Sequence, residues 1–423
     1  MKKEIKGRIE AVRRGETPSG YCETIAGIMP TDWSSAPLYA ISDVLSEQAG
    51  DREFETLSIS AGIGFVNQAE KFGKELSGKQ YAKYTVLRRG DFAYNKGNSK
   101  RYPQGCTYML REREEAAVPN VFECFRITQG HPEYYEQLFI NGFMNKQLTR
   151  KINHGVRDDG LLNLTDDDFY STVFPMPSIT EQQKIAEILA TCDRVIALKQ
   201  QLLEEKRRQK EWLMQKLLDP DSGVQPAGFK NGKWKKIVIG EECEMFSGGT
   251  PKAGKEEYYA GGTIPFIRSG EIAESKTELF LTEDGYNSSS AKMVEAGDLL
   301  YALYGANSGE CAISQINGAI NQAILCVRPK HIERKVLYYL LYAKKERIIA
   351  TYLQGGQGNL SAEIIKKLVV ELPVDRDHQS SIVEILHMAE QEIACCESEL
   401  AEWQQKKKAL MQLLLTGLVR VNA

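Results

Sequence analysis

The sequence predicts a repeated architecture in which a globular segment and a long coiled-coil helix each occur twice along the chain. Two observations carry this prediction. Residues 177–221 resemble residues 373–421, and both copies place mostly apolar residues at alternating steps of three and four. Shorter motifs in front of each copy recur as well. Because repeated segments adopt the same local structure, internal repetition decides the architecture.

The two helical copies align at a constant offset. It superposes Gln182 on Gln379, Ile185 on Ile382, and the Glu-Ile-Leu run at 187–189 on residues 384–386. A Pro stands just upstream of each copy, and the residue before a Pro is disfavoured in helical conformation. Each copy is therefore predicted to form one helix of roughly 38 residues, about 57 Å long at about 1.5 Å per residue.

The steps of three and four define a heptad seam in each predicted helix. Such a stripe is more often the buried face of a helix bundle. Here two copies of equal length and phase favour pairing with each other, as an intramolecular coiled coil. The seam and partner-contact residues predicted in this way are Ile185, Leu189, Ile196, Leu203, Leu213, Ile382, Leu386, Ile393, Leu400 and Leu410.

The segments that precede the two helices also share motifs. Gly-Asp-Phe at 90–92 resembles Gly-Asp-Leu at 297–299, and Asn-Leu-Thr at 163–165 resembles Asn-Leu-Ser at 359–361. We expect an amino-terminal segment that completes the carboxy-terminal helix and makes the repeat pseudo-two-fold. The predicted parts are a first globular domain at 1–177, a central helix at 178–220, a second globular domain at 221–373 and a carboxy-terminal helix at 374–423.

Composition excludes several classes of protein. The chain has 54 Lys plus Arg against 57 Asp plus Glu, a net charge of −3, so no uniform positive field surrounds it and DNA binding would need local patches. No apolar run approaches the roughly 18 to 20 residues that cross a bilayer, which predicts a soluble protein without a membrane partner. Nine cysteines without C-x-x-C spacing fit a reduced cytoplasm better than a disulfide framework or zinc ribbon.

One candidate nucleic-acid loop lies in the first globular segment, where residues 96–105 read KGNSKRYPQG. Lys96, Lys100 and Arg101 offer donors to phosphate oxygens, and Asn98 and Arg101 are able to read base edges. A solvated surface turn explains the same composition equally well.

A second candidate loop begins with SGGTPK at residues 247–252 and continues into IPFIRSGEI. Glycine turns alternate there with cations and hydroxyls, as in a loop that follows a DNA backbone. Its candidate contacts are Thr250, Lys252, Arg268 and Ser269, and a packed surface loop is again the alternative.

Catalytic motifs are absent. Residues 249–255 satisfy G-x-x-x-x-G-K, but Glu256 stands where a phosphate-binding loop places the Ser or Thr that binds Mg²⁺. The sequence has no H-E-x-x-H, G-x-S-x-G or N-P-P-Y motif, and its five histidines are scattered. We therefore expect no catalytic residue, no metal ligand and no resident cofactor.

The EQQKIAEIL and LMQKLL signatures, the GGTP turn, GDLLYALYG and GQGNLS, in this order, resemble the specificity subunit of type I restriction-modification enzymes over essentially the whole chain. The resemblance implies an α+β fold with two target-recognition domains of mixed α/β structure. Each domain would read one half of a bipartite, asymmetric double-stranded DNA target. An antiparallel coiled coil would set the half-site spacing and dock two methyltransferase subunits.

The same resemblance places the chemistry on partners. S-adenosylmethionine would be bound by the methyltransferase subunits, and ATP and Mg²⁺ would serve a restriction or translocase subunit. The first domain departs from the pattern because it lacks a GGTP turn, so the two domains should read different half-sites. A competing hypothesis is a coiled-coil scaffold whose globular domains bind proteins. A third, an enzyme with an unfamiliar site, would show turnover in the purified chain.

Overall fold

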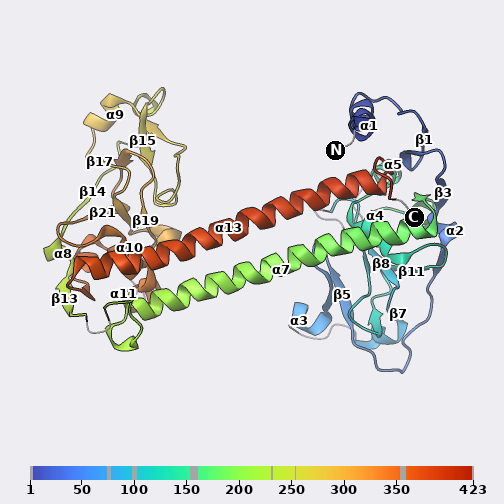
Figure 1. Cartoon of the computed structure of the whole chain (residues 1–423), viewed down its shortest axis with the longest axis horizontal. Helices are drawn as coiled ribbons and strands as arrows, with labels where there is room; N and C mark the ends of the chain where they lie inside the picture. Colours follow the sequence, from blue (N-terminus) through green and yellow to red (C-terminus); the bar gives the residue numbers. More distant parts are fainter. Residues whose placement is uncertain are drawn as a thin grey trace. The chain divides into compact units, whose positions relative to one another are not determined.

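The structure is a computed structural model (Figure 1) that describes residues 3–73, 78–97, 102–152, 161–229, 232–252, 254–352 and 359–421. The chain divides into two compact units. The first unit joins Met1–Lys199 to Glu399–Ala423, and the second is Gln200–Ser398. Each long helix is therefore shared between the units, and each unit contains one half of both helices.

The first unit is built on a four-stranded antiparallel sheet in the order β4-β11-β8-β9. Phe92 and Phe125 stack from neighbouring strands with their ring centroids 5.3 Å apart, in a core that also takes Ile185 and Leu414 from the long helices. The strands of this sheet are β4 (Ser42–Val44), β8 (Phe92–Asn95), β9 (Cys106–Met109) and β11 (Glu123–Ile127).

Four two-stranded ladders and several short helices complete the first unit. The ladders pair β1 with β2, β3 with β12, β5 with β6 and β7 with β10. Their strands are β1 (Tyr21–Thr24), β2 (Gly27–Pro30), β3 (Ser34–Pro37), β5 (Leu57–Ser60), β6 (Gly64–Asn67), β7 (Thr85–Arg88), β10 (Glu115–Val118) and β12 (Val173–Met176). The helices are α1 (Lys3–Arg13), α2 (Leu38–Ile41), α3 (Gln68–Phe72), η1 (Gly78–Lys83), α4 (Pro132–Ile140), α5 (Asn145–Lys151) and α6 (Asp166–Tyr170).

The second unit repeats the central sheet of the first, in the order β14-β21-β18-β19. A two-stranded ladder of β13 and β22 corresponds to the ladder of β3 and β12. These strands are β13 (Trp234–Val238), β14 (Cys243–Ser247), β18 (Leu299–Ala302), β19 (Cys311–Ile313), β21 (Ile324–Pro329) and β22 (Val369–Pro373). The helices are η2 (Pro220–Ser222), α8 (Ile239–Glu242), η3 (Glu256–Tyr258), α9 (Glu283–Asn287), η4 (Gly305–Asn307), α10 (Arg334–Ala343), α11 (Lys345–Tyr352) and α12 (Ala362–Lys366).

A further four-stranded sheet, in the order β16-β15-β20-β17, distinguishes the second unit from the first. Its strands are β15 (Ile264–Ile267), β16 (Phe280–Leu281), β17 (Lys292–Val294) and β20 (Gly318–Ile320). Strands β15 and β20 run parallel, with Ile267 opposite Ile320. Because parallel strands end at the same edge, the residues that follow β15 and β20 are neighbours at that edge.

The two long helices are α7 (Ile179–Leu217) and α13 (Arg376–Leu415), of 39 and 40 residues. They lie side by side (Figure 1) and antiparallel within each unit. In the first unit Asp193 pairs with Lys407 and Lys199 with Glu399, and in the second Lys210 pairs with Glu390 at 2.8 Å. The predicted coiled coil is confirmed.

The predicted seam residues all avoid full exposure. Ile185, Leu189, Ile382 and Leu386 are completely buried and Leu203 is 6% exposed, whereas Leu202 beside it is 42% exposed. The remaining predicted positions, Ile196, Leu213, Ile393, Leu400 and Leu410, are half-buried. The completely buried positions lie in the cores of the two units, where the ends of the helices pack. The contrast between Leu203 and Leu202 is that of a two-helix contact, because a pair of helices covers only one stripe on each partner.

The beginning of each long helix is fastened by the same glutamine. Gln182 donates through Nε2 to the Pro177 carbonyl at 2.9 Å, and its Oε1 accepts the His131 N–H at 2.8 Å. Gln379 donates to the Pro373 carbonyl at 2.7 Å and accepts the Glu333 N–H at 2.8 Å. The repeat therefore preserves a buried polar contact that satisfies backbone groups at the helix entrance.

The amino-terminal segment of the first unit lies against the end of α13. The Tyr21 hydroxyl donates to the Gly417 carbonyl at 2.6 Å, and the Trp33 indole N–H donates to Glu181 at 3.1 Å. Arg420 reaches both Glu181 and Asp32 at 2.8 Å. These contacts join the two ends of the described chain around the start of α7.

Candidate nucleic-acid interface

The GGTP turn of the second unit is packed, and two glycines make that packing feasible. The Gly248 N–H donates to the Asn321 carbonyl at 3.2 Å, and a Cβ at Gly248 would overlap the Ile320 carbonyl oxygen. A Cβ at Gly249 would overlap the Ser290 hydroxyl. The turn is therefore held against the ends of β20 and β17, as the alternative of a packed surface loop predicts, but its next residue remains exposed.

The exposed residue is Thr250, whose hydroxyl donates to Gln322 Oε1 at 2.8 Å. Both side chains are exposed. Gln322 occupies the tip of the turn between β20 and β21, where the Asn321 side chain accepts the Ala323 N–H at 2.9 Å and the Ile324 N–H donates to the Asn321 carbonyl at 3.3 Å. The sequence did not predict Gln322 as a site residue, because its hydrogen-bond partner Thr250 is 72 positions away.

Arg268 and Ser269 directly follow β15, so the parallel register brings them to the edge where Asn321 and Gln322 follow β20. The Arg268 side chain is 47% exposed, and its guanidinium lies 2.6 Å from both Glu271 and Glu278. Its hydrogen bonds lower the pKa of Glu271 to about 2, so this carboxylate stays ionised. Arg268 would have to exchange these partners in order to contact phosphate.

Lys252 is exposed, one residue beyond the buried Pro251. The structure thus gathers Thr250, Arg268 and Ser269 at one edge of the β15–β20 sheet, together with Gln322, and places Lys252 in the adjoining loop. All four residues predicted for this domain remain predictions as DNA contacts. What the structure supplies is a shared edge that offers hydroxyl, amide and guanidinium groups.

In the first unit Lys96 is a largely buried cation. Its side chain is 13% exposed, and its ammonium lies 2.7 Å from both Glu123 and Asp166. Burial lowers the pKa of Lys96, but the bonds to Asp166 and Glu123 outweigh burial and raise it. The ammonium therefore pairs with carboxylates of its own unit, and Lys96 would have to break both ion pairs in order to contact a phosphate. Asn98, Lys100 and Arg101 lie outside the described residues.

The backbone carbonyl of Lys96 is bonded in the same way as that of Leu303, its counterpart in the second unit. The Leu162 N–H donates to the Lys96 carbonyl at 3.0 Å, and the Leu360 N–H donates to the Leu303 carbonyl at 3.0 Å. Leu303 is 1% exposed. One repeat therefore places a buried leucine where the other places a lysine, which explains why Glu123 and Asp166 gather around it.

The aspartate of the Gly-Asp motif is buried in both units. Asp91 is 1% exposed and Asp298 is 3% exposed. Arg126 donates to Asp91 at 2.6 and 2.9 Å, and Arg328 donates to Asp298 at 3.0 and 2.6 Å. Burial alone would raise the pKa of Asp298, but the bonds from Arg328 and from the Glu295 N–H outweigh it and lower the pKa.

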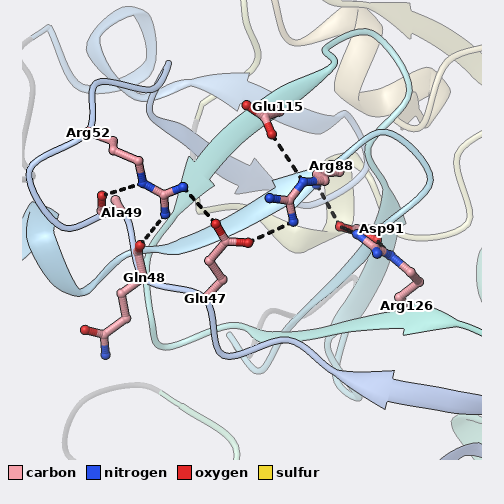
Figure 2. A network of polar contacts seen from close by, with 8 residues as sticks. All are labelled: Glu47, Gln48, Ala49, Arg52, Arg88, Asp91, Glu115 and Arg126. Carbon is pink, nitrogen blue, oxygen red and sulfur yellow. Dashed lines mark hydrogen bonds and ion pairs between the residues drawn. The ribbon is translucent and has the colours of Figure 1, made fainter.

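Figure 2 shows the polar network that extends from the Asp91 carboxylate in the first unit. The Arg88 N–H donates to Asp91 at 2.7 Å, while the Arg88 guanidinium lies 2.8 Å from Glu47 and 3.2 Å from Glu115. Glu47 also binds Arg52 at 2.8 Å, and the two arginines lower its pKa. No spacing pattern in the sequence marks this network, since its members come from four separate segments.

Among the described residues, no group of three or more His, Cys, Asp or Glu side chains is placed to hold a metal ion. No helix within the described ranges is long and apolar enough to span a membrane.

Fold and candidate interface together define a class: paired α+β units whose long helices form an antiparallel coiled coil, with an exposed polar edge on the second unit. The family model of the type I restriction modification DNA specificity domain matches residues 125–206 and 231–402. The chain belongs to this family.

Curated relatives carry the same description. A protein of Methanocaldococcus jannaschii, provisionally described as the MjaX type I restriction enzyme specificity subunit, is 24% identical over 95% of this chain and 96% of its own length. The specificity subunit of the Escherichia coli EcoR124I/EcoR124II enzyme is 25% identical over 50% of this chain and 52% of its own length.

Solved structures share the fold. A chain from a study of the assembly and conformational transition of a type I restriction-modification system superposes with a TM-score of 0.61 at 17% identity, covering 92% of this chain and 99% of that one. The specificity subunit of a type I system from M. genitalium superposes with a TM-score of 0.55 at 14% identity, covering 93% and 97%.

Proposed function

We propose that this chain is the DNA sequence-recognition subunit of a type I restriction-modification complex, and that each globular unit reads one half of a bipartite, asymmetric target. The family match, which falls on both units, is the observation that carries the proposal. The common central sheet with dissimilar neighbouring strands supports it further. One frame that presents two different surfaces suits two different half-sites.

The coiled coil has two roles in this proposal. It sets the spacing between half-sites, and its exposed faces dock two methyltransferase subunits, which in turn work with restriction or translocase subunits. Holding two modest binding surfaces on one stiff element raises their joint affinity, because the second contact costs little further entropy. The chain itself contributes recognition and no catalysis.

The near-neutral charge of the chain fits a DNA interface that is shared with the methyltransferase subunits. A net charge of −3 gives little attraction for phosphates, so we propose that the methyltransferase subunits supply much of the neutralisation. The logarithm of DNA affinity should then fall more steeply with salt for the complex than for this chain alone. An equally steep slope for the isolated chain would contradict this division of roles.

Domain exchange tests the recognition proposal. Replacing residues 221–373 by the corresponding domain of a relative should change one half of the methylated sequence and leave the other half unchanged. Genome-wide mapping of methylated adenines, with and without the chain, provides the readout. A change in both halves would reject modular reading. If methylation persists at every site when the chain is removed, the result would favour the alternative in which the chain is a scaffold that binds proteins.

Helix length tests the spacing proposal. Removing one heptad from α7 and a matched heptad from α13 shortens the pair by about 10 Å, which corresponds to about 3 base pairs at about 3.4 Å per step. The preferred spacer should contract by that amount. Removal of equal lengths keeps the apolar seam of the two helices in register. An unchanged spacer between the half-sites would therefore refute the proposal that the coiled coil sets their spacing.

A further inference from the structure

We propose that Gln322 is a base-reading residue of the second unit, and that Thr250 orients its amide. This inference rests on the proposed function and deepens it, because it assigns a specificity-determining role to a residue outside the predicted loops. The juxtaposition that carries it is the contact between two exposed side chains, 2.8 Å apart, on separate segments.

The first step is that the contact is built by the backbone. Thr250 reaches Gln322 only because the preceding turn lies against the end of β20, and that approach requires glycine at 248. A β-carbon there would meet the Ile320 carbonyl. The close approach of the Gly248 backbone to β20 therefore sets the position of one exposed hydroxyl.

The second step is that the Gln322 backbone is also constrained. The Asn321 side chain accepts the Ala323 N–H at 2.9 Å, and the Gly248 N–H occupies the Asn321 carbonyl at 3.2 Å. An exposed glutamine ordinarily loses side-chain freedom when it binds a ligand. Here the turn and the Thr250 hydroxyl have already restricted it, as expected of a preorganised recognition group.

The third step concerns chemistry. Because Oε1 accepts a hydrogen bond from the Thr250 hydroxyl, the amide plane is oriented and both Nε2–H groups remain as donors. In the major groove, guanine presents N7 and O6, adenine N7 and thymine O4 as acceptors, whereas cytosine presents only the N4 donor. Gln322 should therefore donate a hydrogen bond to guanine, adenine or thymine at its contact position and discriminate against cytosine.

The experiment uses the full-length chain assembled with its methyltransferase subunits and a pool of duplex DNA with randomised half-sites. Wild-type protein should disfavour cytosine at one position of one half-site by about 5- to 100-fold, the range of a good base contact. Gln322→Glu replaces the donor by an acceptor and should favour cytosine at that position. Thr250→Val should weaken the wild-type preference at the same position, and Gln322→Ala should remove it.

Gln315 provides a matched control. It is exposed in the same unit, but it precedes β20, at the opposite end of the strand from Gln322, and its amide donates to the Ala273 carbonyl at 2.5 Å. Gln315→Glu should select the wild-type sequence. Gln322→Ala at the tip of a turn preserves the fold, and circular dichroism verifies this for each variant.

The outcomes separate this inference from the proposed function. If the wild-type complex selects no sequence, the proposed function fails. If the wild-type complex selects a bipartite sequence while Gln322→Glu and Gln322→Ala select the same bases, the inference is overturned and the recognition function stands. A uniform loss of affinity without a change of base preference at one position would also overturn it, because that pattern marks a phosphate contact.

Discussion

The buried Asp91 gives the sharpest test of how the first unit is held together (Figure 2). Its carboxylate is 1% exposed and receives two hydrogen bonds from Arg126 and one from the Arg88 N–H. Arg126→Met removes both side-chain donors and leaves a buried anion with a single backbone donor. Loss of one partner of a buried ion pair costs about 3 to 5 kcal/mol.

The exposure of Arg126 reduces that figure. Its side chain is 44% exposed, so water partly replaces the lost donors. We expect Arg126→Met to lower the free energy of unfolding by about 2 to 3 kcal/mol. Asp91→Asn should cost less, about 1 to 2 kcal/mol, because the amide oxygen still accepts the Arg88 N–H. The double variant should be more stable than the sum of the two effects predicts, by about 1 to 2 kcal/mol.

Urea unfolding measures these changes in the free energy of unfolding, and hydrogen exchange of the native variants shows which unit is destabilised. Exchange should accelerate in peptides from β7 to β11, while peptides from β18 and β21 keep wild-type protection, since Asp298 and Arg328 form the matching pair of the second unit. An Arg126→Met cost below about 0.5 kcal/mol, or strict additivity in the double variant, would refute the reasoning.

Three further predictions follow from burial and charge. Leu203→Ala in the seam should cost about 2 to 4 kcal/mol and lower Tm in calorimetry, while Leu202→Ala, at an exposed neighbour, should leave Tm nearly unchanged. Lys96→Met removes the cation beside Glu123 and Asp166. Burial raises the pKa of Glu123, so this carboxyl takes up a proton more readily at pH 5 than at pH 7.5, and the Tm deficit of the variant should be larger at pH 7.5. An equal deficit at both pH values would contradict the ion-pair role. Burial lowers the pKa of His378, so the unfolded chain takes up a proton at this residue more readily than the folded chain does, and stability is lost as the pH falls below ~6.5. His378→Gln should therefore flatten the Tm profile between pH 7.5 and 5.5, and an unchanged slope in this variant would contradict the assignment.

The long helices were predictable because their signals are local. The heptad steps mark the buried stripe directly, and the structure places Ile185 and Ile382, superposed by the repeat, at complete burial. The helix bounds at Ile179 and Arg376 each fall two or three residues after a Pro. Periodicity and helix stop signals depend on neighbours within one or two turns, so a sequence contains them in full.

The candidate interface was predictable only in part. Composition drew attention to Thr250, Arg268 and Ser269, and the structure brings them to one sheet edge. Composition could not show that the Lys96 ammonium is enclosed by two carboxylates, since Asp166 is 70 positions away. It also could not find Gln322, because neither its own segment nor the spacing of its neighbours marks a glutamine as oriented.

What the sequence determined by itself is the repeat: two helices, two globular segments, and the Gly-Asp motif in each. Those features follow from residue order, since equal segments obey equal local preferences. Only the tertiary structure decided which cations are free for a ligand and which are already paired. That choice depends on carboxylates and carbonyls delivered by distant strands, whose approach is set by packing and by glycines such as Gly248 rather than by any local pattern.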